Sequence, residues 1–269
     1  MSPVALKAYV GSDLHEVCRM PQDPWNLPAP EFCEELRRYK LENHPFKVHP
    51  FFLEWEKGTL PIEHLRVWAP QFYAWLCVIP RAYALRFAQL PWTDELAKYR
   101  GMLLEHLAEE AGYPPEKQQP HPELFLKFCE GIGLSRKQVL SAPWLPGTYL
   151  AIDDFLYVNH YEPFYVSAAG SSEPPNVDLC ERLLPALRKT YKVPEANLEY
   201  YVAHGELDKE HGELVNSIVA DFAGEGPATR RKMWESMLRG FGVHQGLVDS
   251  VVASLRGHPH AAKTEPRAR

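Results

Sequence analysis

Apolar residues recur every three or four positions along nearly the whole sequence, which is the spacing of one face of an α-helix. No stretch alternates apolar and polar residues for long enough to predict a β-strand. Gly58, Gly112 and Gly133 stand just past periodic stretches, where helices commonly end. The pattern therefore predicts an all-α fold, a bundle of seven or eight helices. The weakest helical stretch is residues 167–176, rich in Ser, Gly and Pro, which predicts a surface loop.

The length of 269 residues and a hydrophobic content of 45% are typical of one globular domain. We place this single helical domain at residues 29–256. Residues 1–28 read as a proline-rich N-terminal extension, because their last third is studded with prolines. Residues 257–269 lack apolar periodicity and predict a disordered tail.

Charge and cysteine usage exclude several classes of protein. With 29 basic and 35 acidic residues, the chain lacks the positive charge that nucleic-acid binding needs. Its five cysteines are scattered and form no C-x-x-C pair, which argues against a disulfide framework or a thiolate zinc site. The longest apolar run, residues 74–80, is too short to span a membrane. With no N-terminal signal pattern, these features predict a cytoplasmic protein.

The segment from Glu195 to Phe222 carries polar residues in the middle of its apolar stripe. His204, Asp208 and His211 fall within about 60° of one another on a helix, so their side chains converge. A buried carboxylate beside two imidazoles needs compensation, and a metal ion provides it directly. The alternatives are a metal-free network of hydrogen bonds between His and Asp, or a stripe that faces solvent.

Two further segments place an acid on an apolar stripe. In residues 93–111, Glu110 follows Leu103 and Leu107 on one face, whereas Glu109 lies on the flank. In residues 146–168, Glu162 continues the face of Phe155 and Val158. One such glutamate is commonly half-exposed, but three helices with the same feature indicate a shared site.

The charges of these acids favour two metal ions over one. Glu110, Glu162 and Asp208 together carry three negative charges, which two divalent cations nearly neutralise. Carboxylates with imidazoles are typical ligands of iron or manganese, whereas zinc more often recruits thiolates. The ferritin-like arrangement needs two Glu-x-x-His motifs, and the sequence has none.

Four segments resemble the haem-oxygenase-like di-iron oxidase and oxygenase superfamily, which is related to pyrroloquinoline-quinone synthase and the TenA proteins. They are HPFFLEWEKGTL at residues 49–60, LLEHLAEEAGY at 103–113, HPELFLKF at 121–128, and the closing His204-x-x-x-Asp208-x-x-His211. The resemblance implies a haem-oxygenase-like bundle. It also implies six metal ligands, of which His121 rests on the resemblance alone; Glu109 is the alternative to Glu110. The six are Glu110, His121, Glu162, His204, Asp208 and His211.

The resemblance also implies a function. Two Fe(II) ions with O₂ as co-substrate would oxidise a small molecule of specialised biosynthesis by N-oxygenation, desaturation or oxidative C–C cleavage. An external electron donor and a homodimer are compatible with this activity. The tyrosine and lysine consumed by self-sacrificing para-aminobenzoate synthases match Phe52 and a position near Ser172 here, which argues against that reaction. A thiaminase is disfavoured because residues 146–168 hold no cysteine.

Arg81 and Arg86 interrupt an apolar stretch that is expected to line the substrate pocket. Either guanidinium could bind a substrate carboxylate through two hydrogen bonds, which suggests an amino-acid-like substrate; the alternative is a surface arginine. His106 and His160 lie off the best stripes and read as neighbours of the site or as surface residues rather than ligands. Two other functions stay open: a metal-free oxidase similar to pyrroloquinoline-quinone synthase, and a non-catalytic binding protein on the same scaffold.

Overall fold

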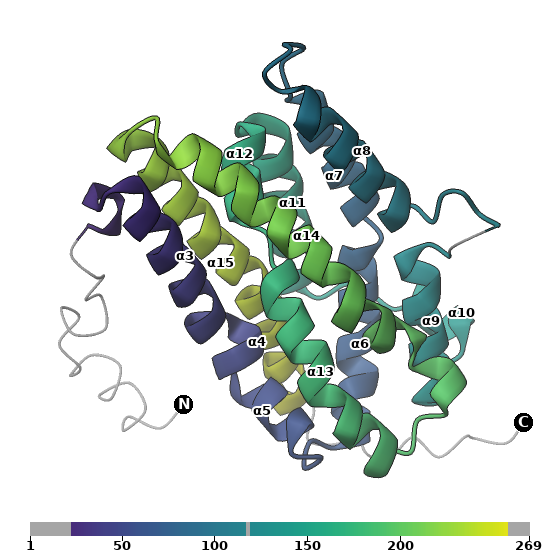
Figure 1. Ribbon diagram of the computed structural model, residues 1–269. Helices are drawn as coiled ribbons and strands as arrows, with labels where there is room; N and C mark the ends of the chain where they lie inside the picture. The colour runs from purple at the N-terminus through teal and green to yellow at the C-terminus, as the bar shows by residue number, and fades with distance from the viewer. Residues whose placement is uncertain (1–22, 117–118, 258–269) are drawn as a thin grey trace, which may run out of the picture.

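A computed structural model describes residues 23–116 and 119–257 of the chain, and for residues 206–210 it describes the backbone alone. Throughout this part the regular structure is helical, as Figure 1 shows, so the all-α prediction is confirmed. Residues 1–22 and 258–269, which include most of the predicted extension and tail, lie outside the described residues.

The helices vary widely in length. Single 3₁₀ turns precede the first and the penultimate α-helix, at Pro24–Asn26 and Glu195–Asn197. The α-helices are α3 (Ala29–Asn43), α4 (Pro45–Val48), α5 (Pro50–Glu56), α6 (Ile62–Leu76), α7 (Ile79–Ala88), α8 (Ala97–Glu110), α9 (His121–Gly131), α10 (Arg136–Leu140), α11 (Pro146–Tyr161), α12 (Phe164–Ala169), α13 (Glu173–Lys189), α14 (Glu199–Ala223) and α15 (Pro227–Gly257).

The long helices pack side by side around an aromatic core. Helix α13 lies along α14, and α11 lies along α15 (Figure 1). Between α5, α6, α9 and α14, the buried rings of Trp55, Trp68, Phe128 and Tyr201 meet edge to face or stacked at centroid distances of 4.9 to 6.2 Å. Such contacts add to the free energy that burying these large apolar surfaces contributes to folding.

Proline explains why there are more helical segments than the seven or eight expected. The predicted helix over residues 146–168 is divided, because Pro163 forces Glu162 into an extended conformation with φ −88° and ψ 149°. Helix α11 therefore ends at Tyr161, and α12 begins after Pro163. Because Glu162 is no longer helical, its side chain does not continue the face of Phe155 and Val158 from which its direction was predicted.

The predicted loop over residues 167–176 is also largely helical. It contains the end of α12 and the first turn of α13, with a junction at Gly170, Ser171 and Ser172. Pro174 and Pro175 lie in the first turn of α13, where a helix loses no hydrogen bond to a proline. The loop prediction was wrong because the two prolines start a helix here.

Gly112 directs the chain from α8 back toward α9. Its φ of +68° is a left-handed conformation that favours glycine, and a Cβ atom there would lie 2.3 Å from the backbone nitrogen of Pro120. This close approach brings the start of α9 beside the end of α8. No helix in the described ranges is long and apolar enough to cross a membrane.

Candidate metal centre

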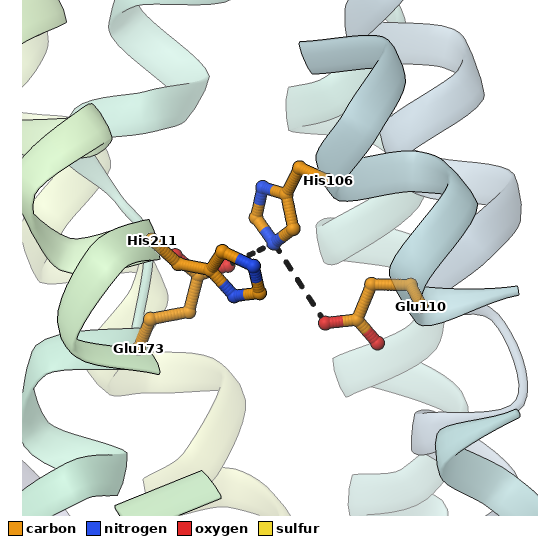
Figure 2. Close-up of side chains that lie close together, drawn as sticks. All are labelled: His106, Glu110, Glu173 and His211. Carbon is orange, nitrogen blue, oxygen red and sulfur yellow. Dashed lines mark ion pairs between the residues drawn. The ribbon is translucent and has the colours of Figure 1, made fainter. Parts of the chain in front are cut away.

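Four buried side chains from three helices converge in the interior (Figure 2). His106 and Glu110 lie one turn apart on α8, Glu173 is the first residue of α13, and His211 lies on α14. One potential ligand atom from each lies within 4.8 Å of the others. Two carboxylates and two imidazoles therefore face a common point.

His106 and His121 compensate the two buried carboxylates. The Nε2 atom of His106 lies 2.9 Å from Oε1 of Glu173 and 3.7 Å from Oε1 of Glu110. The Nδ1 atom of His121 lies 2.7 Å from Oε2 of Glu110. Burial alone would raise the pKa of Glu110, but His121 and His106 hold this pKa well below its usual range.

Glu173 is ionised for the same reason. Burial would raise its pKa, but His106 and the hydroxyl of Tyr83, which donates a hydrogen bond to Oε1 over 2.5 Å, lower the pKa to about 2. Within the described part of the chain, no group donates a hydrogen bond to the buried Oε2 of Glu173. A buried carboxylate oxygen without a donor is costly, and a cation would satisfy it.

On each of the two described histidines of α14, one ring nitrogen donates a hydrogen bond to an oxygen acceptor. Nδ1 of His204 donates a hydrogen bond to the carbonyl oxygen of Tyr200 over 2.7 Å, so Nε2 is the ring nitrogen that could bind a metal. The His204 ring lies 4.4 Å from that of His121. Nε2 of His211 donates to Oε2 of Glu109 over 2.6 Å, so Nδ1 is the ring nitrogen that could bind a metal. Metal-binding histidines commonly have such a partner on the second nitrogen.

The structure brings four of the six predicted ligands together. Glu110, His121, His204 and His211 all lie buried at or beside the cluster. Asp208 lies on α14, in the stretch whose side chains are outside the described residues.

Glu162 is the prediction that the structure contradicts. It lies at the end of α11 and lines a separate pocket, with Lys232, Glu235 and Arg239 of α15. The second carboxylate of the cluster is that of Glu173, which the sequence reasoning missed because residues 167–176 predict a loop. The available signal was Ser-Ser-Glu-Pro-Pro, since prolines are favoured in a first helical turn.

His106 and Glu109 also have roles other than those expected. His106 was read as a neighbour of the site, yet it lies within the cluster, and its ring stacks on that of His211 at 3.9 Å. The sequence did contain an indication of this: His106 lies four residues before Glu110, and residues four apart share a helical face. Glu109, the alternative to Glu110, instead accepts the hydrogen bond of His211.

The donor set fits iron on chemical grounds. Carboxylate oxygens and neutral imidazole nitrogens, with no thiolate among the described donors, are ligands that iron and manganese prefer. The buried Glu173 Oε2 that accepts no hydrogen bond is a further sign that a cation belongs here.

A small cavity of about 30 Å³ adjoins the cluster. Glu110, Glu173 and His204 form part of its lining, together with aromatic and aliphatic side chains of α6, α7 and α11. Neither predicted anchor for a substrate carboxylate belongs to this lining. Arg81 is exposed, and buried Arg86 donates from Nε to Oδ1 of Asn159 over 2.9 Å.

Comparison with known proteins adds independent information about the chain. The sequence model of a haem-oxygenase family described as iron-containing redox enzymes matches residues 66–243. This range contains every residue of the cluster.

Two characterised relatives cover most of the chain. A 4-aminobenzoate synthase of Nitrosomonas europaea is 24% identical over 192 residues, which are 68% of this chain and 76% of the relative. A pyrroloquinoline-quinone synthase of Pseudomonas aeruginosa is 27% identical over 198 residues, 68% of this chain and 72% of the relative.

A solved structure from Shewanella denitrificans, described as a domain with a heme oxygenase-like fold, superposes with a TM-score of 0.70. It covers 90% of this chain and 99% of its own length at 17% identity. The superposition establishes the fold and confirms the haem-oxygenase-like bundle expected from the sequence.

Proposed function

Because the chain belongs to the haem-oxygenase-like family of iron-containing redox enzymes, we propose that it is a non-haem di-iron enzyme. In this proposal it uses O₂ to oxidise a small molecule. N-oxygenation, desaturation and oxidative C–C cleavage are the reactions considered, in the context of specialised biosynthesis. The relatives that act in the formation of 4-aminobenzoate and pyrroloquinoline quinone support a biosynthetic role.

The convergence of His106, Glu110, Glu173 and His211 within 4.8 Å carries this proposal. A purely structural ion-pair network would satisfy both oxygens of each carboxylate, yet the buried Oε2 of Glu173 accepts no hydrogen bond from any described group. His121 and His204 extend the set of nitrogen donors. Asp208 completes the proposed ligands by its position between His204 and His211 on α14.

Each protein group has a definable task in this centre. His106, Glu110, His121, Glu173, His204, Asp208 and His211 would provide the ligands of the metal ions. Bound iron supplies one- and two-electron chemistry with O₂. Reduction of O₂ to two waters takes four electrons, so a two-electron substrate oxidation requires two more from an external donor.

The surrounding residues orient the ligands and limit access of water. Glu109 fixes the ring of His211, and the carbonyl of Tyr200 fixes the ring of His204. Phe72, Trp75 and Phe155 line the cavity on the substrate side, and such apolar walls exclude bulk water from the reacting groups.

A comparison of Glu173→Gln with Glu162→Gln tests this assignment. Each protein is titrated with Fe(II) without oxygen, and bound iron is measured after removal of free metal. We expect two Fe(II) per chain in the wild type and in Glu162→Gln, but a loss of at least one in Glu173→Gln. Exposure of the loaded wild type to O₂ should then produce a transient visible absorption and consume oxygen.

Two results would contradict the proposal. One is a wild-type chain that binds no iron under these conditions; such a protein would fit a metal-free oxidase or a non-catalytic binding protein. The other is equal iron content in both variants, which would remove Glu173 from the ligand set. Circular dichroism of both variants verifies that each is folded.

A further inference from the structure

We propose that the substrate is a compact carboxylate, and that Lys40 binds its negative charge at the end of the cavity lined by Trp75. This inference deepens the proposed function and rests on it, because it concerns the space that adjoins the candidate metal centre. It keeps the carboxylate that the sequence suggested, but assigns its binding to Lys40 instead of Arg81 or Arg86.

Lys40 is a buried cation that lacks a counter-ion in contact with it. It lies on α3 and is only 4% exposed, and among the described residues its ammonium group forms neither a hydrogen bond nor an ion pair. Burial lowers the pKa of Lys40 to about 8 against the opposing charge of Glu173, so the side chain is mostly protonated at neutral pH. Since a buried charge without a partner is unfavourable, an anion that paired with Lys40 would be stabilised.

Two N–H donors near Lys40 also lack an acceptor. Nδ1 of His44 accepts a hydrogen bond from the backbone nitrogen of Phe46, so the neutral ring carries its proton on Nε2. Neither this Nε2 nor Nε1 of Trp75 has an acceptor within the described part of the chain. The ring of His244 lies between them, 5.1 Å from that of His44 and 4.8 Å from that of Trp75. Buried donors without an acceptor are costly, and carboxylate oxygens are strong acceptors.

The proximity of His44 to Lys40 is visible in its charge state. Burial, His244 and Lys40 together hold the pKa of His44 well below 6.5. The uncharged ring therefore stays a hydrogen-bond donor beside the ammonium group and does not itself attract an anion. In this arrangement Lys40 supplies the charge, and His44 and Trp75 supply neutral donors.

The cavity connects these donors to the metal centre and limits the size of a ligand. Trp75 lines one part of its wall and Glu173 another. Lys40 is close enough to Glu173 for their charges to interact, and the flexible stem of a lysine can direct its ammonium group toward a ligand. A volume of about 30 Å³ has room for roughly two water molecules. A short carboxylate therefore suits this space better than a long or bulky one.

The balance of charge also favours an anion once metal ions are bound. Two Fe(II) ions would bring four positive charges, and the buried side chains of Lys40 and Arg86 add two more. The acids at or beside the centre can supply four negative charges; they are Glu109, Glu110, Glu173 and Asp208. A carboxylate would reduce the remaining positive charge, whereas a neutral or cationic ligand would not.

Arg86 contributes to this positive field but is held by other groups. Its Nε donates to Oδ1 of Asn159 over 2.9 Å, and its Cζ lies 4.6 Å from the ring centroid of Tyr83. Arg81 is exposed. Lys40 has no such contacts among the groups that the structure describes, so it is the cation that can pair with a substrate.

Matched ligands that differ in charge or in size test the inference. The probes are ¹³C-labelled acetate and propanoate, the corresponding amides, and 3-phenylpropanoate as a bulky acid. Binding is measured by NMR titration of the metal-free protein and of protein loaded with redox-inactive Zn(II). We expect each short acid to bind about ten-fold or more tightly than its amide in both forms, because hydrogen bonds to charged groups are the stronger ones. The bulky acid should bind about ten-fold more weakly than propanoate in both forms, because the cavity is small.

Variants of lysine identify the residue responsible. Lys40→Met removes the charge but keeps a long unbranched side chain, and it should weaken acetate binding about ten-fold while leaving acetamide binding unchanged. Lys40→Arg keeps a cation and should retain most of the preference for the acid. Lys47→Met is the matched control and should have no effect, because Lys47 is exposed, pairs with Asp178 at 3.1 Å and does not line the cavity.

A tryptophan pair tests the neutral donor. Trp75→Phe removes the indole N–H but keeps an aromatic ring, and it should weaken acetate binding about three- to ten-fold. Trp55→Phe should leave acetate binding unchanged. The Nε1 atom of Trp55 also lacks a described acceptor, but this residue does not line the cavity.

Three results would overturn the inference: an amide that binds as tightly as its acid, equal acetate binding by the wild type and Lys40→Met, or 3-phenylpropanoate that binds as tightly as propanoate. Circular dichroism verifies that the variants are folded; should Lys40→Met fail to fold, the comparison of acid with amide on the wild type decides. If the chain binds no iron, the proposed function falls, but the charge preference of the metal-free protein still decides this inference. If iron binds and the acids have no advantage, only the inference falls.

Discussion

Tyr83 holds Glu173 in place at the boundary between the cavity and the metal centre. Its hydroxyl donates to Oε1 of Glu173, and its ring centroid lies 4.5 Å from that of His106 and 4.6 Å from Cζ of Arg86. This bond leaves Oε2 of Glu173 for another partner. The orientation of a candidate metal ligand thus depends on a phenol that is not itself in the donor cluster.

Removal of this phenol should weaken metal binding. Loss of a hydrogen bond to a metal ligand commonly lowers affinity by ~10–100-fold, so we expect Tyr83→Phe to lower Zn(II) affinity about ten-fold or more in a competition titration with a chromophoric chelator. Tyr99→Phe is the matched control, because Tyr99 also donates to a carboxylate, that of Asp221, away from the cluster. Equal effects of the two substitutions would contradict a specific role of Tyr83.

Sequence alone identified Glu110, His204 and His211 because helical periodicity is accurate inside an uninterrupted helix. It misplaced one carboxylate where the period was interrupted. Pro163 ends helix α11, so the helical spacing that predicted an inward direction for Glu162 no longer applies there. Glu173 begins a new helix, and the local sequence does not predict how this helix is oriented. A period predicts a face within one helix, but the relation between helices depends on tertiary packing.

Helices α11 and α15 approach so closely at Gly147 that no side chain fits at this position. A Cβ atom on Gly147 of α11 would lie 2.1 Å from the carbonyl oxygen of Gly246 on α15. Since the obstacle is backbone, it cannot be relieved by a side-chain rotation. The sequence contained both glycines, but their proximity became visible only in the fold.

We expect Gly147→Ala to destabilise the protein by ~1–3 kcal/mol, the range typical of overpacked sites. The measurement is urea unfolding followed by circular dichroism. Gly242→Ala on α15 is the control: its Cβ would have no described neighbour within 4 Å, and alanine favours a helix by up to ~1 kcal/mol. Similar free energies of unfolding for the two variants would show that the crossing can adjust.

Helix α14 should respond most to metal binding. It carries His204, His211 and Asp208, and bound metal would link it to α8, α9 and α13. Binding to the native state alone lowers the population of opened forms. We therefore expect Fe(II), added without oxygen, to slow amide hydrogen exchange in residues 200–215 more than in α15. Equal exchange with and without Fe(II) would mean that the helix is fully formed before metal binds.

The molecule as a whole should lose stability in mild acid because of a second group of histidines. His44 and His244 are buried with their rings 5.1 Å apart, against Phe46 and Trp75. Burial lowers the pKa of His244 to about 3 and places that of His44 well below 6.5. Both imidazoles are therefore neutral in the folded protein, whereas they take up protons on unfolding below pH 6.5.

In this pH range the unfolded state binds more protons than the native state. The free energy of unfolding therefore falls as the pH falls from 6.5 toward 3. Each such histidine contributes a slope of at most ~1.4 kcal/mol per pH unit. Urea unfolding of metal-free protein between pH 6.5 and 4.5 should show this slope, and His244→Phe should reduce it. The exposed His160 provides the control, since His160→Phe should leave the slope unchanged. An unchanged slope in His244→Phe would contradict the prediction.

The candidate metal donors are spread along the chain from residue 106 to residue 211 and meet only when α8, α9, α13 and α14 have packed together. A ribosome has therefore synthesised most of the protein before the last of these ligands emerges. Residues 106–121 alone provide an incomplete set, so a growing chain has little means to capture iron selectively. Under the proposed function, metallation would then follow folding, and the ion would have to enter a buried centre in an already assembled protein. The iron supply of the cell at that moment, rather than during translation, would set the fraction of active molecules.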